Sequence, residues 1–111
     1  MSTVFGLIIA GKIPSKKVFE NERILAIEDI HPVAPVHILI MPKKPIANLQ
    51  SIEPADLPLI GEIIRVAQQI AEEKGIEEGY RLLTNNGPDS GQTIFHLHFH
   101  LIGGRVLGAL A

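Results

Sequence analysis

The chain has 111 residues, enough for one domain with its own hydrophobic core and too few for a second domain. Hydrophobic residues make up 46% of the chain and charged residues 20%, a balance that is typical of a folded globular protein and excludes a disordered one. With 10 basic and 12 acidic residues the formal net charge is -2, so no broad basic surface for nucleic acid is expected. Cysteine is absent, which excludes disulfides and thiolate metal sites.

The first predicted element is a short helix over residues 4–10. Its apolar residues at 4, 5, 8 and 9 follow a helical spacing, and Gly11 and Pro14 end the pattern. This apolar run is too short for a membrane span and lacks the basic flank of a signal peptide. We therefore expect a soluble, cytoplasmic protein with no membrane partner.

Two strands, a loop and a third strand are predicted next. Residues 18–20 and 24–27 flank a polar turn and suit a hairpin. Two prolines within residues 29–35 restrict the backbone and disfavour helix, which indicates an ordered loop. Residues 36–41 predict the third strand, which Pro42 ends.

A long helix is predicted over residues 57–74, where apolar residues recur along one helical face. Asp56 is a suitable N-cap, and Gly75 is a natural C-terminal stop. Residues 80–84 and 94–102 predict the last two strands.

This order of elements favours an α+β fold, in one domain over residues 1–111. The predicted sheet is mainly antiparallel and has five strands, accompanied by one short and one long helix. Neither a GxGxxG nor a GxxxxGK[ST] motif is present, so a Rossmann or P-loop nucleotide site is not supported.

The last predicted strand carries three histidines at alternate positions, His96, His98 and His100. Because the side chains of a strand alternate between its two faces, these imidazoles are expected to share one face. The other face would carry the apolar residues Phe95, Leu97, Phe99 and Leu101.

A metal site and a nucleophile are competing interpretations of this pattern. The outer two histidines of such a strand are ~13 Å apart, so three imidazoles cannot easily converge on one ion. Two of them with His37 remain a minor metal alternative. A neutral imidazole with one nitrogen held by a partner can instead attack phosphorus with the other. The polar, glycine-rich loop at 85–93 would then bind phosphate through exposed N–H groups.

The sequence resembles the histidine-triad (HIT) superfamily and, within it, the Hint branch of nucleoside phosphoramidases. The signature His-Φ-His-Φ-His-Φ-Φ, in which Φ is apolar, is met by residues 96–102. The similarity extends over residues 3–105, nearly the whole chain. Further matching stretches are Phe5-Gly6, residues 26–32, residues 34–37, Pro42-Lys43-Lys44, Gly91-Gln92 and Gly103-Gly104-Arg105.

The resemblance implies hydrolysis of a purine nucleotide at its α-phosphate. His98 would attack phosphorus to form a nucleotidyl-histidine intermediate, which water resolves. His100 would contact the phosphate, and His96 and His37 would complete the histidine network. Phosphate or the leaving group would be held by Asn85, Gly91, Gln92 and Thr93. Asp29 would accept the ribose hydroxyls, and the base would lie among Phe5, Ile8, Ile9, Ile13, Ile27, Ile30 and Leu39.

The resemblance also implies a homodimer whose two sheets join across the two-fold axis. We expect no metal or other cofactor. The chain departs from the family pattern at Thr93, where serine is usual, at Ile27, commonly aromatic, and at Pro45, commonly histidine. It ends at Ala111 without the longer tail of many Hint proteins, so the leaving group is open. A dinucleoside-polyphosphate hydrolase and a nucleotide-binding adaptor with vestigial catalysis are the alternative functions.

Overall fold

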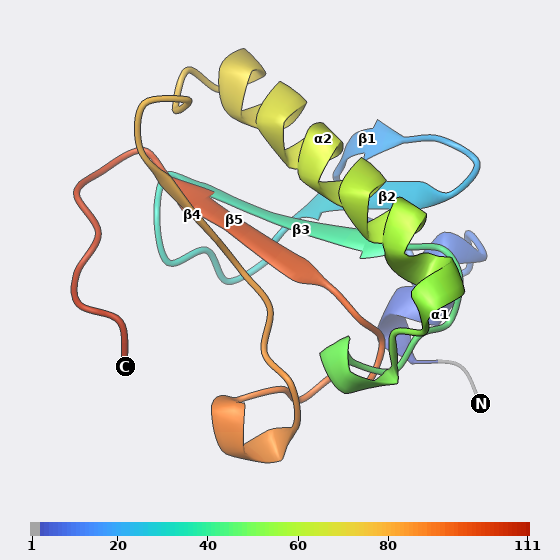
Figure 1. Ribbon diagram of the computed structural model, residues 1–111. Coiled ribbons are helices and arrows are strands. Elements are labelled where there is room, and N and C mark those ends of the chain that lie inside the picture. The colour runs from blue at the N-terminus through green and yellow to red at the C-terminus, as the bar shows by residue number, and fades with distance from the viewer. Residues whose placement is uncertain (1–2) are drawn as a thin grey trace.

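The computed structural model describes residues 3–111 and shows an α+β fold (Figure 1). The two helices are α1 (Val4–Ile9) and α2 (Leu57–Glu73). The strands are β1 (Lys17–Glu20), β2 (Ile24–Glu28), β3 (Val36–Pro42), β4 (Tyr80–Leu83) and β5 (Phe99–Gly103). Short 3₁₀ helices lie at Leu49–Ser51, Pro54–Asp56 and Pro88–Ser90. No helix in this part of the chain combines the length and apolar character needed to cross a membrane.

The five strands within residues 3–111 form one antiparallel sheet in the order β1-β2-β3-β5-β4. This confirms the predicted sheet. The pairing of β3 with β5 lies at its centre and sets Leu39 opposite His100 and His37 opposite Ile102. Segments that are about sixty residues apart in the chain therefore meet at the position of the last histidine.

The two faces of the sheet bury different clusters. Helix α2 lies across one face, as Figure 1 shows, and its buried residues include Ile63 and Ile70. They pack on Ile24, Ala26, Ile38, Ile40, Leu97, Phe99 and Leu101. The other cluster consists of Phe5 and Ile8 of α1 with Leu25, Ile27, Leu39 and Met41. Because strand side chains alternate, neighbouring residues of β2 and β3 serve opposite clusters, and α1 covers only part of its face.

The start of α2 differs from the predicted capping. Asp56 occupies the N-cap position, but its side chain makes no capping bond to α2. Its carboxylate instead accepts hydrogen bonds from the Glu53 amide (3.0 Å) and the Lys44 ammonium (2.6 Å). The reason is the 3₁₀ turn at Pro54–Asp56, whose capping box uses Asp56 before α2 begins. The C-terminal end agrees with the prediction, since Gly75 adopts a φ of 70° just past the helix.

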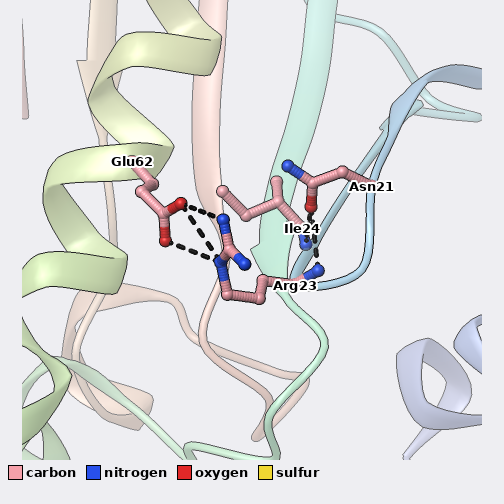
Figure 2. Close-up of polar contacts among 4 residues, drawn as sticks. All are labelled: Asn21, Arg23, Ile24 and Glu62. Atoms are coloured by element: carbon pink, nitrogen blue, oxygen red, sulfur yellow. Dashed lines mark hydrogen bonds and ion pairs between the residues drawn. The ribbon is translucent and has the colours of Figure 1, made fainter.

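A polar contact joins the β1–β2 hairpin to the surface of α2 (Figure 2). The Nε of Arg23 donates to both carboxylate oxygens of Glu62, at 2.9 and 3.1 Å. The Asn21 side chain accepts from the amides of Arg23 and Ile24, which closes the hairpin turn. Both charged groups are exposed to solvent, so water screens this ion pair and it contributes little to the stability of the fold.

The last strand is shorter than predicted. It spans Phe99–Gly103 rather than residues 94–102, because the ladder with β3 ends at the Ile40–Phe99 pair. Beyond that pair Leu97 donates its amide to Ile46, outside the strand. Pro42, with no N–H to donate, ends β3. The prediction that Phe95 belongs to the core face is also wrong, since 46% of its surface is exposed.

Candidate active site

The three histidines of the motif lie on the face of the sheet that carries α1. The Phe5 ring contacts His96 and His98 edge-on, at centroid distances of 6.4 and 4.8 Å. The rings of His98 and His100 are 5.1 Å apart. Only His100 belongs to β5, yet the alternation persists through the residues before it, because Leu97, Phe99 and Leu101 all lie in the α2 cluster.

The ring of His98 has one nitrogen held and the other free of protein hydrogen bonds in residues 3–111. Its Nδ1 donates to the carbonyl oxygen of His96 at 2.7 Å, so the lone pair of the neutral ring lies on Nε2. Burial lowers the pKa of His98 below its usual value of 6.5, although the hydrogen bond to His96 acts in the opposite direction. A neutral imidazole with an available Nε2 is the form that a nucleophile requires.

The His96 carbonyl, which accepts from His98, is held in position by two neighbouring hydrogen bonds. His96 is only 3% exposed, and its Nε2 donates to the Pro42 carbonyl at the end of β3 (2.7 Å). The next amide, of Leu97, donates to Ile46 at 2.7 Å. His96 thus anchors the irregular segment before β5, so that its carbonyl points at His98.

His37 and His100 form a second pair. The Val33 amide donates to Nδ1 of His37 at 3.2 Å, so the proton of the neutral ring lies on Nε2. That Nε2 is 2.9 Å from Nδ1 of His100 and donates to it. His100 therefore carries its own proton on Nε2, as a donor. Burial and the neighbouring His98 and His37 lower the pKa of His100 to about 4, which keeps the ring neutral at pH 7.

Asp29 lies beside this pair. One of its carboxylate oxygens accepts from the His31 amide at 2.8 Å. The other oxygen is 3.4 Å from Nε2 of His37. The Asp29 carboxylate acts to raise the pKa of His37, but burial dominates and lowers it.

A metal ion is the chemical alternative at this place. Ligand atoms of Asp29, His37 and His100 lie within 4.8 Å of one another. However, the Val33 amide occupies Nδ1 of His37, so its Nε2 bears a proton and offers no lone pair to an ion. The hydrogen-bond pattern favours a histidine relay over a metal centre.

His98 and His100 open into a pocket of about 340 Å³ between α1, β2, β3 and the segment before β5, whereas His37 and His96 do not line it. It is lined by Val4, Phe5, Ile8, Ile27, Glu28, Asp29, Ile30, His31, Leu39, Thr93, Ile94, His98 and His100. The structure thus brings together the predicted nucleophile, the predicted ribose acceptor and most of the predicted base contacts. Sequence reasoning missed Val4, Glu28, His31 and Ile94. Each of these four is next in the chain to a predicted site residue, and this was the one sequence feature that could have indicated them.

Some predicted site residues do not line this pocket. Ile9 and Ile13 pack from outside against the cluster under α1. Their predicted contact with the base stays a prediction. Asn85 and Gly91 are not part of the pocket lining either. The φ of 102° at Gly91 shows the unusual backbone conformation that the glycine-rich loop was expected to require.

Gln92 has a structural environment that the sequence did not reveal. Its side chain is buried, and its Nε2 donates to the carbonyls of Ala47 and Ile94, at 2.9 and 3.0 Å. Its Oε1 accepts from the Gly87 amide at 2.7 Å. Both amide hydrogens are therefore used by backbone carbonyls, and Gln92 ties the loop at 85–93 to the chain after β3. Its predicted contact with phosphate stays a prediction.

Comparisons with known proteins place the chain in a family. The model of the HIT domain matches residues 10–107. The chain belongs to the HIT family. A HIT-like protein of Chlamydia pneumoniae is 53% identical over 109 residues, which cover 98% of this chain and 99% of that protein.

Solved structures of HIT proteins share the fold. A HIT family hydrolase from Legionella pneumophila has a TM-score of 0.94 and 42% identity, and the match covers 96% of each chain. A histidine triad nucleotide-binding protein from Candida albicans has a TM-score of 0.82 and 34% identity, covering 99% of this chain and 85% of that one.

The lowered pKa of His100 predicts a loss of stability in acid. The unfolded ring binds a proton near pH 6.5, whereas the folded ring resists protonation down to about pH 4. The contribution of His100 to the free energy of unfolding is therefore complete above pH 6.5 and is lost as the pH falls toward 4. Urea unfolding at pH 7 and pH 5 should show a smaller pH dependence in His100→Asn than in the wild type. An equal pH dependence in both proteins would contradict the assigned cause.

Proposed function

We propose that this protein hydrolyses purine nucleoside 5′-phosphoramidates at the α-phosphorus, with His98 as the nucleophile. The observation that carries the proposal is the free Nε2 of a neutral His98 ring at the wall of the pocket, with Nδ1 held by the His96 carbonyl. Membership of the HIT family and the similarity to a HIT family hydrolase and a nucleotide-binding protein support it.

In the first step, the lone pair on Nε2 of His98 forms a bond to phosphorus, and the bond from phosphorus to the amine nitrogen breaks. The amine leaves after taking up a proton from solvent. The His98 ring becomes positively charged, and its Nδ1–H remains bonded to the His96 carbonyl at 2.7 Å, which stabilises that charge.

In the second step, a water molecule attacks phosphorus and the bond to His98 breaks. Nucleoside monophosphate is released, a proton from water passes to solvent, and His98 returns to its neutral form. The Nε2–H of His100 donates to a phosphate oxygen in both steps, because its Nδ1 is occupied by His37.

The rest of the pocket suits a nucleoside. Apolar side chains from α1, β2 and β3 offer a face for the base, among them Phe5, Ile8 and Leu39. The Asp29 carboxylate lines the same pocket and accepts the ribose hydroxyls. Thr93 is exposed and lines the same pocket as His98, and its hydroxyl contacts the phosphate.

A variant lacking the nucleophile tests the reaction. His98→Ala should lower turnover of an adenosine 5′-phosphoramidate by ~10³-fold or more, because no other group forms the intermediate. Binding of AMP, followed by calorimetry, should change little. Release of AMP and amine would be measured by chromatography, with dinucleoside polyphosphates as competing substrates for the alternative hydrolase function. Turnover by His98→Ala at the wild-type rate would contradict the mechanism.

We also propose that two copies join through β4, one of the two edge strands of the sheet. Its residues Arg81, Leu82 and Leu83 are only partly buried in the single chain, and an unpaired edge favours pairing with another strand. Sedimentation equilibrium should report twice the chain mass of 12.1 kDa. A species at 12.1 kDa across the micromolar range would contradict this assembly.

A further inference from the structure

The loop at 29–35, between β2 and β3, sets the protonation pattern of the histidine pair. Its Val33 amide is the group that donates to Nδ1 of His37, at 3.2 Å. If this amide moved away, Nδ1 could carry the proton, and Nε2 of His37 would become an acceptor. The bond to His100 would then reverse, and His100 would lose its Nε2–H. The position of a single backbone amide therefore determines which nitrogen of His100 bears a hydrogen.

The segment after β5 holds this loop in two ways. The Nη2 of Arg105 donates to the Val33 carbonyl at 2.8 Å, and Nη1 donates to the Val106 carbonyl at 2.8 Å. Next to it, Gly104 adopts a φ of 96° and packs so closely on Pro35 that an added Cβ would lie 2.9 Å from the proline Cβ. Figure 1 shows the loop and the start of this C-terminal segment at the same end of the sheet.

The contacts form a continuous chain from Arg105 to the substrate pocket. Arg105 binds the Val33 carbonyl, the Val33 amide binds His37, and His37 binds His100 at 2.9 Å. Among the described residues, the loop's other hydrogen bonds lie nearer its base: the Asp29 amide donates to the His37 carbonyl, and the His31 amide donates to the Asp29 side chain. Arg105 is the side chain that fixes the loop at Val33, whose amide bonds to His37.

We propose that Arg105 is a positioning residue: by holding the Val33 carbonyl it keeps the Val33 amide on His37, which leaves His100 with an Nε2–H for the phosphate. The inference rests on the proposed function for its catalytic consequence. Its structural part, the state of the two rings, is independent of any substrate.

The first experiment measures the rings in the intact, substrate-free protein. Imidazole ¹⁵N chemical shifts distinguish an Nδ1–H ring from an Nε2–H ring. In the wild type at pH 7, His37 and His100 should both carry the proton on Nε2. In Arg105→Met, a population with the proton on Nδ1 should appear in both rings. Arg105→Lys, which can still donate to the Val33 carbonyl, should restore the wild-type pattern.

Arg65 offers a matched control. It is an exposed arginine on α2 whose Nη1 donates to the Gln68 side chain at 2.9 Å, away from the loop. Arg65→Met should leave both rings unchanged. Should Arg105→Met fail to fold, Gly104→Ala perturbs the same loop from Pro35 and should produce the same Nδ1–H population.

The second experiment measures hydrolysis of an adenosine 5′-phosphoramidate. Arg105→Met should lower kcat by ~10- to 100-fold with a much smaller change in KM, because donor geometry at the phosphate matters more in the transition state. Arg105→Lys should recover most of the loss.

Unchanged His37 and His100 tautomers in both Arg105→Met and Gly104→Ala would overturn the inference, even with full turnover in the wild type. The proposed function fails in a different way: altered tautomers without any phosphoramidate turnover in the wild type would leave the positioning role intact and refute the reaction.

Discussion

The hydrogen bond from Nδ1 of His98 to the carbonyl oxygen of His96 orients the proposed nucleophile, and several features of the fold serve it. His96 lies in the segment before β5, which is outside the sheet, so its carbonyl is not used in strand pairing. His96 anchors that segment by donating to Pro42, where β3 ends. Because β5 begins only at Phe99, the His96 carbonyl stays free to select the reactive nitrogen of His98.

The two faces of the sheet have different roles: one packs the core, and the other carries the pocket. On one face, α2 seals a continuous apolar cluster that includes Leu97, Phe99 and Leu101. These residues alternate with the histidines, so packing against α2 also fixes the direction of the imidazoles. On the other face, the shorter α1 covers only part of the sheet and leaves the pocket open beside it. Residues 96–101 thus supply core side chains and reactive side chains at successive positions.

Much of the fold and the histidine face follows from local patterns. The helical spacing in residues 57–74 and the alternation in residues 96–101 predict α2 and the shared direction of the three imidazoles. The pairing of His37 with His100 required the resemblance, because the contact joins residues 63 apart in the chain. The reach of β5 depends on its partner strand, which Pro42 ends, and the sequence of residues 94–98 alone is as suitable for a strand as the rest.

The internal role of Gln92 and the exposure of Phe95 lay beyond sequence reasoning for the same cause. Each depends on where the chain after β3 passes, since Gln92 bonds to Ala47 and the Leu97 amide to Ile46. The effect of the Val33 amide on the tautomer of His37 cannot be predicted from sequence either, because every residue except proline has a main-chain amide. The sequence shows which reactive side chains are present, and tertiary contacts determine which of their ring nitrogens carry a proton.

The covalent intermediate is the most direct test of the central claim. The wild-type protein would be mixed with an adenosine 5′-phosphoramidate and quenched within milliseconds under alkaline conditions, which preserve a phosphorus–nitrogen bond to histidine. Mass spectrometry of peptides should then locate an adenylyl group on His98. An adenylyl group on another residue, or turnover with none on any histidine across the quench times, would contradict the account.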